Sequence, residues 1–346
     1  MHMADALISP TVGAVMCAAS AVANGLAIKE VRRDDLCEKK IPIMAVMGAF
    51  VFAAQMINFA IPGTGSSGHI GGGILLVAML GGYPALLSIS AVLIIQCLFF
   101  ADGGLLAIGC NIFNLGVVPC LIVYPLIFRP IIAKSMTSGR IAIATVVASV
   151  VGLQIGALCV VAETLLSGIA NIPFSTFALL MQPIHLAIGI MEGVITAAVL
   201  CFVHKMRPEI LESAFDRTAI ISATPMRNSL IALAATALLV GGGLSLFVSS
   251  KPDGLEWAVE KSTGMAEPEA EGPIFERAAH IQESIAIMPD YNFKEAEGEG
   301  TGAGTALAGI LGGAFTFLLA GATAFSISAM KKRHVNGAKP EIGATQ

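Results

Sequence analysis

Residues 141–166 read IAIATVVASVVGLQIGALCVVAETLL, and Glu163 is the only acidic or basic side chain in this run. An α-helix needs about 20 apolar residues to cross the hydrocarbon core of a bilayer. Within lipid, a single segment of this kind satisfies its backbone polar groups as a helix. The stretch therefore predicts a membrane-spanning helix, and the rest of the chain can be compared with it.

Eight further apolar segments lie on either side of this run. They cover residues 7–28, 41–61, 70–80, 85–100, 112–132, 177–203, 229–248 and 303–330. Of all 346 residues, 55% are hydrophobic and only 13% are charged, whereas a soluble domain carries roughly a quarter charged residues. We therefore predict an all-α, polytopic membrane protein with about seven membrane segments in residues 1–205 and two in residues 229–335. The segment 70–80 is too short to cross untilted, and whether it spans the membrane stays open.

The distribution of Lys and Arg predicts the orientation of the chain. Basic residues gather in alternate loops and after the last span: Lys29, Arg32, Arg33, Lys39, Lys40, Arg129, Lys134, Arg140, Lys205, Arg207, Arg217, Arg227, Lys331, Lys332 and Arg333. Because such loops favour the cytoplasm, we expect the amino terminus outside and the carboxyl terminus in the cytoplasm. The polar linker 206–228 is then cytoplasmic, and the acidic loop 250–302 lies outside.

The first two residues, Met1 and His2, form a candidate metal chelate. An α-amine loses its proton readily to a metal. The Met1 amine and the His2 amide nitrogen close a five-membered ring with a metal ion, and the amide and His2 Nδ1 close a six-membered ring. No signal peptide is visible, since Asp5 lies where basic residues would be expected, so we expect both residues to be retained. The alternative is a start codon followed by an ordinary histidine.

His69 is the candidate for a fourth nitrogen ligand. It follows residues 62–68, a loop of small residues that can bring backbone close to a buried site. Under the predicted orientation, His69 lies on the same side of the membrane as His2. Four nitrogens in a plane favour Ni²⁺ or Cu²⁺, whereas Zn²⁺ prefers a tetrahedron, and Co²⁺ is less demanding. The alternative for this loop is a plain turn between helices.

Five other polar residues are candidates for supporting the metal ligands from behind: Asp5, Asn58, Ser67, His185 and Glu192. Asp5 could instead cap the first helix. His185 and Glu192 are seven residues apart on one helix face, where they could form a relay beneath the metal or a purely structural pair. Ionisable side chains within spans usually face the protein interior.

Several motifs in residues 1–205 resemble the substrate-capture subunit of nickel and cobalt energy-coupling-factor (ECF) transporters, the NikM/CbiM type. They are Met1-His2-Met3-Ala4-Asp5 with Ser9-Pro10, Asn58-Phe59 with Pro62-Gly63 through Ser67-Gly68-His69 and Gly71-Gly72-Gly73, Asp102-Gly103-Gly104 with Gly109-Cys110-Asn111-Ile112-Phe113-Asn114, and His185 through Glu192-Gly193. The resemblance implies a metal held by the Met1 amine, the His2 amide and imidazole, and the His69 imidazole. It also implies a prokaryotic inner membrane as the location.

The second part, residues 229–335, resembles the companion subunit NikN/CbiN through Pro252-Asp253-Gly254-Leu255-Glu256. The chain is thus similar to two subunits fused, with an outer loop that is long and acidic. No G-x-x-x-x-G-K-[ST] motif occurs, so we expect no ATP to be bound by this chain. The resemblance implies a transmembrane coupling subunit (NikQ/CbiQ-like) and ATPase subunits (NikO/CbiO-like) as partners.

The sequence predicts a metal-capture subunit of an ATP-driven importer surrounded by membrane lipid. Nickel and cobalt are not separated by the residues, although the planar nitrogen set leans toward nickel. Alternatives are a cobalt importer serving cobalamin biosynthesis and an autonomous divalent-metal channel or carrier. An enzyme is not predicted, since no H-E-x-x-H or G-x-S-x-G motif occurs, and nucleic acid is excluded as a partner by the net charge of −4.

Overall fold

The computed structural model describes residues 1–34, 37–218, 226–247, 249, 251–265, 270–293 and 302–337. The middle of the predicted linker and parts of the predicted acidic loop therefore lie outside the described residues. Within the described part, seven helices are long and apolar enough to cross a membrane. The prediction of an all-α polytopic membrane protein is confirmed.

The long elements follow the predicted apolar segments closely. They are α1 (Pro10–Arg33), α2 (Cys37–Gln55), α4 (Gly82–Phe100), the continuous run α5 (Ile108–Ile112), η2 (Phe113–Phe128) and α6 (Arg129–Ala133), then α7 (Ser138–Ser167), α8 (Phe174–Met206), α10 (Met226–Gly242) and α13 (Gly302–Gly337). Of these, η2 is a π-helix that contains Pro119 and Pro125. Proline lacks the N–H that an α-helix needs, which favours such a departure from α geometry.

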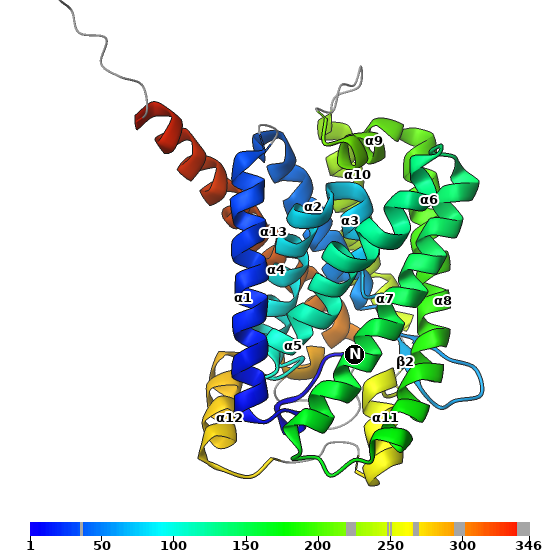
Figure 1. Cartoon of the computed structure of the whole chain (residues 1–346), viewed down its shortest axis with the longest axis vertical. Helices are drawn as coiled ribbons and strands as arrows, with labels where there is room; N and C mark the ends of the chain where they lie inside the picture. Colours follow the sequence, from blue (N-terminus) through cyan, green and yellow to red (C-terminus); the bar gives the residue numbers. More distant parts are fainter. Residues whose placement is uncertain are drawn as a thin grey trace, which may run out of the picture.

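The short elements lie at the two ends of the bundle or inside it. They are η1 (Asp5–Leu7), β1 (Phe59–Ala60), β2 (Ser67–Gly68), α3 (Gly73–Leu80), α9 (Pro208–Asp216), η3 (Leu244–Phe247), α11 (Gly254–Thr263), α12 (Pro273–Ile285) and η4 (Pro289–Tyr291). The two strands pair antiparallel, with Phe59 opposite Gly68. Helices α11 and α12 lie at the end of the bundle nearer the amino terminus, and α9 lies at the opposite end (Figure 1).

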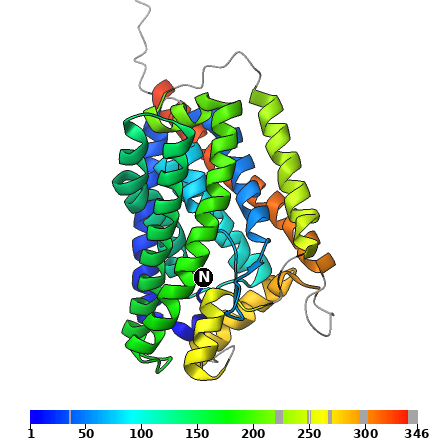
Figure 2. The ribbon, with the colours of Figure 1, turned by 90° about the vertical axis from the view of Figure 1, so that its right-hand side faces the viewer.

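Helices of the second part pack along one side of the first. Helices α10 and α13 both contact α2 and each other, while α11 contacts α8. In the view turned by 90°, α10 runs along the outside of the bundle, and the amino terminus lies within the bundle beside α11 (Figure 2). The second part therefore reaches the first both along its length and at the end that holds the amino terminus.

Helix α3 settles the open question about residues 70–80. It has eight residues, all of them buried, and spans about 12 Å, so it does not cross a bilayer by itself. It begins after Gly72, whose φ is 78°. A Cβ on Gly72 would lie 2.4 Å from Val51 Cγ1, so only glycine fits there. Because α2 ends at Gln55 instead of continuing to residue 61, residues 56–72 form a loop that leads into this buried half-helix.

The first helix is capped by Ser9 and not by Asp5. The Ser9 hydroxyl accepts a hydrogen bond from Val12 N at 3.4 Å, and Pro10 is the first helical residue, where its fixed φ suits a helix start. Asp5 lies earlier, in η1, and its carboxylate accepts hydrogen bonds from the backbone N–H groups of Leu106 at 2.8 Å and Ala107 at 3.1 Å. Asp5 thus fastens the amino-terminal segment to the connection between α4 and α5.

Candidate metal centre

The amino-terminal segment is drawn into the bundle by Asn111 of α5. The Asn111 side chain accepts a hydrogen bond from Met3 N at 2.7 Å and donates one to Met3 O at 3.2 Å. Gly104 N also donates to Met3 O, at 2.9 Å. Met3 is fully buried and Met1 is only 6% exposed. The backbone of the first residues is therefore fixed by neighbours on the α4–α5 side of the bundle.

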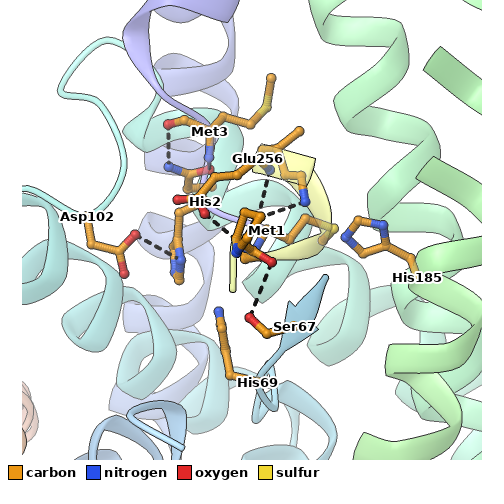
Figure 3. A network of polar contacts seen from close by, with 12 residues as sticks. Met1, His2, Met3, Ser67, His69, Asp102, His185 and Glu256 are labelled. Atoms are coloured by element: carbon orange, nitrogen blue, oxygen red, sulfur yellow. Dashed lines mark hydrogen bonds and ion pairs between the residues drawn. The ribbon is translucent and has the colours of Figure 1, made fainter. Parts of the chain in front are cut away.

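His2 and His69 lie against each other. Their rings are stacked, with centroids 5.5 Å apart and planes inclined by 12°. His69 Nδ1 lies 3.0 Å from Ile70 O. Because a carbonyl oxygen can only accept, Nδ1 carries the proton and Nε2 keeps its lone pair. The structure thus brings Met1, His2 and His69 together, although the last of these is far away in sequence (Figure 3).

The loop that carries His69 is held from two sides by buried polar side chains. Gln55 Nε2 donates to Gly71 O at 2.9 Å, and Gln96 Nε2 donates to Gln55 Oε1 at 3.0 Å. Glu192 Oε1 accepts from Gly72 N at 3.0 Å. These bonds pair backbone groups of Gly71 and Gly72 at the buried end of the loop, where unpaired groups would be costly.

Two carboxylates contact the nitrogens of the amino terminus, and sequence reasoning did not single them out. Asp253 Oδ2 lies 2.5 Å from the Met1 amine, and Asp102 Oδ1 lies 3.2 Å from His2 Nδ1. Tyr291 donates its hydroxyl to the other oxygen of Asp102. Both aspartates belong to motifs that carried the family resemblance, and that was the only signal for them in the sequence. The second part thus contributes Asp253 directly and Tyr291 through Asp102.

Residues 251–256, which we call the PDGLE turn, cover the metal centre. Asp253 caps α11 by accepting from Leu255 N at 2.7 Å and Glu256 N at 2.9 Å, and the Glu256 carboxylate accepts from Asp253 N at 2.9 Å. This reciprocal arrangement is a capping box. Ser67 N donates to Pro252 O at 2.8 Å, and Ser67 Oγ donates to Lys251 O at 2.7 Å. The turn is therefore rigid in itself and hydrogen-bonded to β2, beside His69.

The environment sets the charge states of the site. Burial lowers the pKa of His2, against the opposing effect of Asp102. Burial also lowers the pKa of His69 to about 4, together with the nearby positive charges of the amine and His2. Burial alone would raise the pKa of Asp253, but the charge of the amine and the hydrogen bonds outweigh it and keep that pKa below its ordinary value. At neutral pH both imidazoles are neutral and offer lone pairs, while Asp253 is ionised.

The predicted supporting residues differ in how close they come to this centre. Ser67 joins the PDGLE turn, as described above. His185 lines a cavity of about 10 Å³ together with Met1, His69 and Asp253. Asn58 contacts the second part through its backbone carbonyl, which accepts from Ser249 N at 3.0 Å, and its side-chain oxygen has no hydrogen-bond partner within the described residues.

The possible pairing of His185 with Glu192 does not occur. His185 Nδ1 lies 2.8 Å from Met181 O, and Glu192 bonds to Gly72. Seven residues of helix separate the two side chains by about 10 Å along the axis, which is too far for a direct contact. They therefore serve two different places, His185 at the metal centre and Glu192 farther along α8.

Side chains alone do not make a metal site at the amino terminus. Within the described residues, no three His, Cys, Asp or Glu side chains converge in a geometry that could hold a metal ion. Met1, His2 and His69 supply only two imidazoles. A metal ion bound here would need backbone nitrogens, and the Met1 amine and the His2 amide lie beside the two rings.

Comparison with known proteins places both parts of the chain. The profile described as "Cobalt uptake substrate-specific transmembrane region" (CbiM) matches residues 2–210, and that of the PDGLE domain matches residues 227–329. A putative fused nickel transport protein NikMN of Archaeoglobus fulgidus is 29% identical over 312 residues, which cover 90% of this chain and 94% of that protein. The fused nickel transport protein NikMN of Rhodobacter capsulatus is 31% identical over 281 residues, or 77% and 78% of the two chains.

A solved structure resembles more than half of the chain. It is described as the crystal structure of a truncated transition metal transporter, with 30% sequence identity and a TM-score of 0.53 over 60% of this chain and 99% of that one. The relatives are transport proteins and not enzymes, as the sequence predicted. The chain is a multi-pass membrane protein that belongs to the CbiM family of cobalt-uptake substrate-specific transmembrane proteins, with a PDGLE domain fused behind it.

Proposed function

We propose that this chain captures Ni²⁺ or Co²⁺ as the substrate-binding subunit of an ECF importer. The cargo is held by the Met1 amine, the His2 amide nitrogen, His2 Nδ1 and His69 Nε2. The observation that carries the proposal is the burial of the Met1 amine beside the stacked imidazoles of His2 and His69. The names of the fused relatives support nickel or cobalt as the cargo.

The four nitrogens suit a metal in a plane because of the two chelate rings at Met1 and His2. The His69 imidazole completes the plane from the loop after β2. In the structure, His2 Nδ1 faces Asp102, so binding through Nδ1 requires the ring to exchange its contact with Asp102 for the metal. Asp102 then lies near a bound dication and offsets part of its charge.

Asp253 supports the amine ligand. A coordinated amine keeps two N–H bonds, and the Asp253 carboxylate at 2.5 Å is placed to accept one of them. A carboxylate behind a metal ligand orients it and raises its basicity. In this proposal the PDGLE turn both covers the metal centre and aims the amine at the metal.

The orientation and the partners extend the same proposal. The amino terminus and α11 lie at one end of the bundle, and α9 and the end of α13 lie at the other (Figure 1). With the basic loops in the cytoplasm, the metal centre opens toward the outside. Energy for release then comes from a coupling subunit and ATPase subunits, which are NikQ/CbiQ-like and NikO/CbiO-like.

A cobalt importer is the second candidate, and the CbiM match favours it. Cobalt taken up in this way would serve cobalamin biosynthesis. Spectroscopy of the loaded protein separates the two metals by their preferred geometry. A yellow, diamagnetic Ni²⁺ complex shows a planar field of four nitrogens, whereas a preference for Co²⁺ in direct competition supports the second candidate.

Extension of the amino terminus by one glycine before Met1 tests the chelate. The extension converts the amine into an amide and moves the new amine away from His69. We expect the affinity for Ni²⁺ to fall by more than about a hundredfold, since even groups behind a metal ligand are worth 10–100-fold. One glycine added after Gln346 is the matched control and leaves the affinity unchanged. Equal affinity in the two proteins, measured by competition with a chelator, excludes the proposed ligand set.

A further inference from the structure

A second buried cavity lies next to the metal centre. Its volume is about 20 Å³, and among its lining residues are Gly71, Asn114, Leu115, Ser149, Leu153 and Glu192. We call it the inner cavity. Three of these residues, Gly71, Leu115 and Leu153, also line the cavity beside Met1 and His69. The two cavities therefore share a wall.

Three oxygen atoms at the inner cavity have no hydrogen-bond partner within the described residues. They are Glu192 Oε2, Asn114 Oδ1 and Ser149 Oγ. Glu192 is 3% exposed, and Asn114 and Ser149 are each 2% exposed. Buried oxygens are nearly always paired, because an unpaired one keeps the cost of its lost hydration. Three of them around one small cavity indicate a ligand between them.

Glu192 connects the inner cavity with the loop that carries His69. Its Oε1 accepts from Gly72 N at 3.0 Å, while Oε2 would lie 3.4 Å from a Cβ placed on Gly71. Gly71 is two residues after His69, so a residue without a side chain forms part of the wall. Along α8, Glu192 lies about 10 Å from His185, in the direction of α9. The inner cavity is thus deeper than the metal centre when viewed from the α11 end.

The charges around the inner cavity suit a cation. Glu192 lines it, and Asn114 Nδ2 donates to Glu163 Oε2 at 2.8 Å, so a second buried carboxylate lies directly behind Asn114. A buried carboxyl group either takes up a proton or is balanced by a nearby positive charge, and a bound cation would displace the proton. Carboxylate, amide and hydroxyl oxygens form a hard ligand set, which accepts divalent metal ions. A volume of about 20 Å³ has room for about one ion or one water.

We propose that the inner cavity is a second site for the transported divalent cation, with side-chain oxygens of Glu192, Asn114 and Ser149 as ligands. This inference rests on the proposed function and names the next position of the same cargo. Ni²⁺ and Co²⁺ bind more weakly to such oxygens than to four nitrogens, as a transit site requires, because an ion must be able to leave it. The cation passes from His69 past Gly71 to Glu192.

Titration of the purified full chain with NiCl₂ in lipid nanodiscs tests this site. The first equivalent enters the nitrogen site and is diamagnetic. We expect a second, weaker equivalent that is paramagnetic, because oxygen ligands exert a weak field and leave Ni²⁺ high-spin. Equilibrium dialysis with metal analysis gives the stoichiometry, and magnetic susceptibility by NMR gives the spin state. Ser149→Ala weakens binding of only the second equivalent, by about tenfold or more. Glu192→Gln weakens binding of the second equivalent more than of the first, because the Gln oxygen can still accept from Gly72 N and hold the His69 loop.

Thr196→Val is the matched control. Thr196 lies on α8 one turn after Glu192, is fully buried and has an unpaired hydroxyl oxygen, but it does not line the inner cavity. We expect Thr196→Val to leave the affinities for both equivalents of Ni²⁺ unchanged. Ser149→Ala, which removes one atom, keeps the test valid if Glu192→Gln does not fold.

The outcomes distinguish this inference from the proposed function. The inner site is overturned if the protein saturates at one equivalent of Ni²⁺, or if neither variant weakens binding of a second equivalent. A water then occupies the inner cavity, and the nitrogen site is unaffected by this result. If the protein with a glycine before Met1 no longer binds the first equivalent of Ni²⁺ but still binds the second, the result supports two separate sites. A first equivalent that survives this extension overturns the nitrogen site instead.

Discussion

The two parts of the chain meet at the metal centre with different kinds of contact. In the first part, the segments that carry the proposed donor atoms are fixed by bonds within that part, such as those of Asn111 to Met3 and of Gln55 to Gly71. The second part reaches the centre mainly through the PDGLE turn, which makes one ion pair with Met1 and a few hydrogen bonds to Ser67. On the proposed ligand set, the first part supplies the metal ligands and the second part orients and covers them.

The largest effect is expected from His69→Ala, which removes a ligand contributed by the first part. The loss of one of four nitrogens, together with the ring that stacks on His2, should weaken Ni²⁺ binding by more than about a hundredfold. Competition with a chelator measures the affinity, and the absorption spectrum reports the loss of the planar field. His280→Ala is the control, because His280 is exposed on α12 in the second part. Similar affinities in the two variants would remove His69 from the ligand set.

Asp253 should matter less than His69 if the second part only supports the ligands. Asp253→Ala removes the ion pair with the Met1 amine and the cap of α11, and we expect affinity to fall about 10–100-fold. Asp253→Asn retains an oxygen for the cap, so it isolates the charge and should have a smaller effect. Isothermal titration with Ni²⁺ compares the two variants. A loss as large as that of His69→Ala would mean that the second part itself provides a ligand.

The sequence predicted which residues of the first part gather at the proposed metal centre, but not the carboxylates that contact them. Membrane segments follow from apolar runs, and Met1 with His2 follows from chelate chemistry, because both are local properties of the chain. Asp253 lies 252 residues from Met1, and no spacing or periodicity connects the two. The contact depends on how α11 packs on α8, which is a tertiary property.

Local patterns also failed where tertiary packing decides an element's length. Residues 41–61 are apolar apart from Gln55 and Asn58, yet α2 ends at Gln55, whose side chain bonds to Gly71 O. The polar backbone of the loop needs that partner, so the chain leaves the helix there. Asp5 was a plausible cap by sequence, but Ser9 followed by Pro10 makes a better helix start and leaves Asp5 to bind the α4–α5 connection.

Ser67→Ala probes how firmly the two parts are joined. It removes the hydrogen bond from Ser67 Oγ to Lys251 O but keeps the backbone bond from Ser67 N to Pro252 O. One hydrogen bond is worth about 1 kcal/mol, so we expect metal to dissociate roughly fivefold faster with little change in the spectrum. Stopped-flow mixing with excess chelator measures this rate. Thr64→Ala is the control, since among the residues that the structure describes the Thr64 hydroxyl bonds only within its own loop, to Ile61 O and Ser66 N. An equal increase there would attribute the effect to the loop and not to the junction.

The smallest effect concerns Glu256 of the PDGLE turn and its response to pH. Repulsion from Asp253 raises the pKa of Glu256 to about 7. Because this value exceeds that of a free carboxyl, protonation stabilises the turn at low pH, and the contribution is lost as the pH rises through about 7. Metal should therefore dissociate faster at pH 8 than at pH 6, and Glu256→Gln should remove that difference while Glu276→Gln on α12 retains it. The Glu256 side chain is exposed, so solvent screening limits the change to a few-fold. An unchanged pH dependence in Glu256→Gln would assign the response to the metal ligands of the first part, and the second part would then act as a cover that is insensitive to pH.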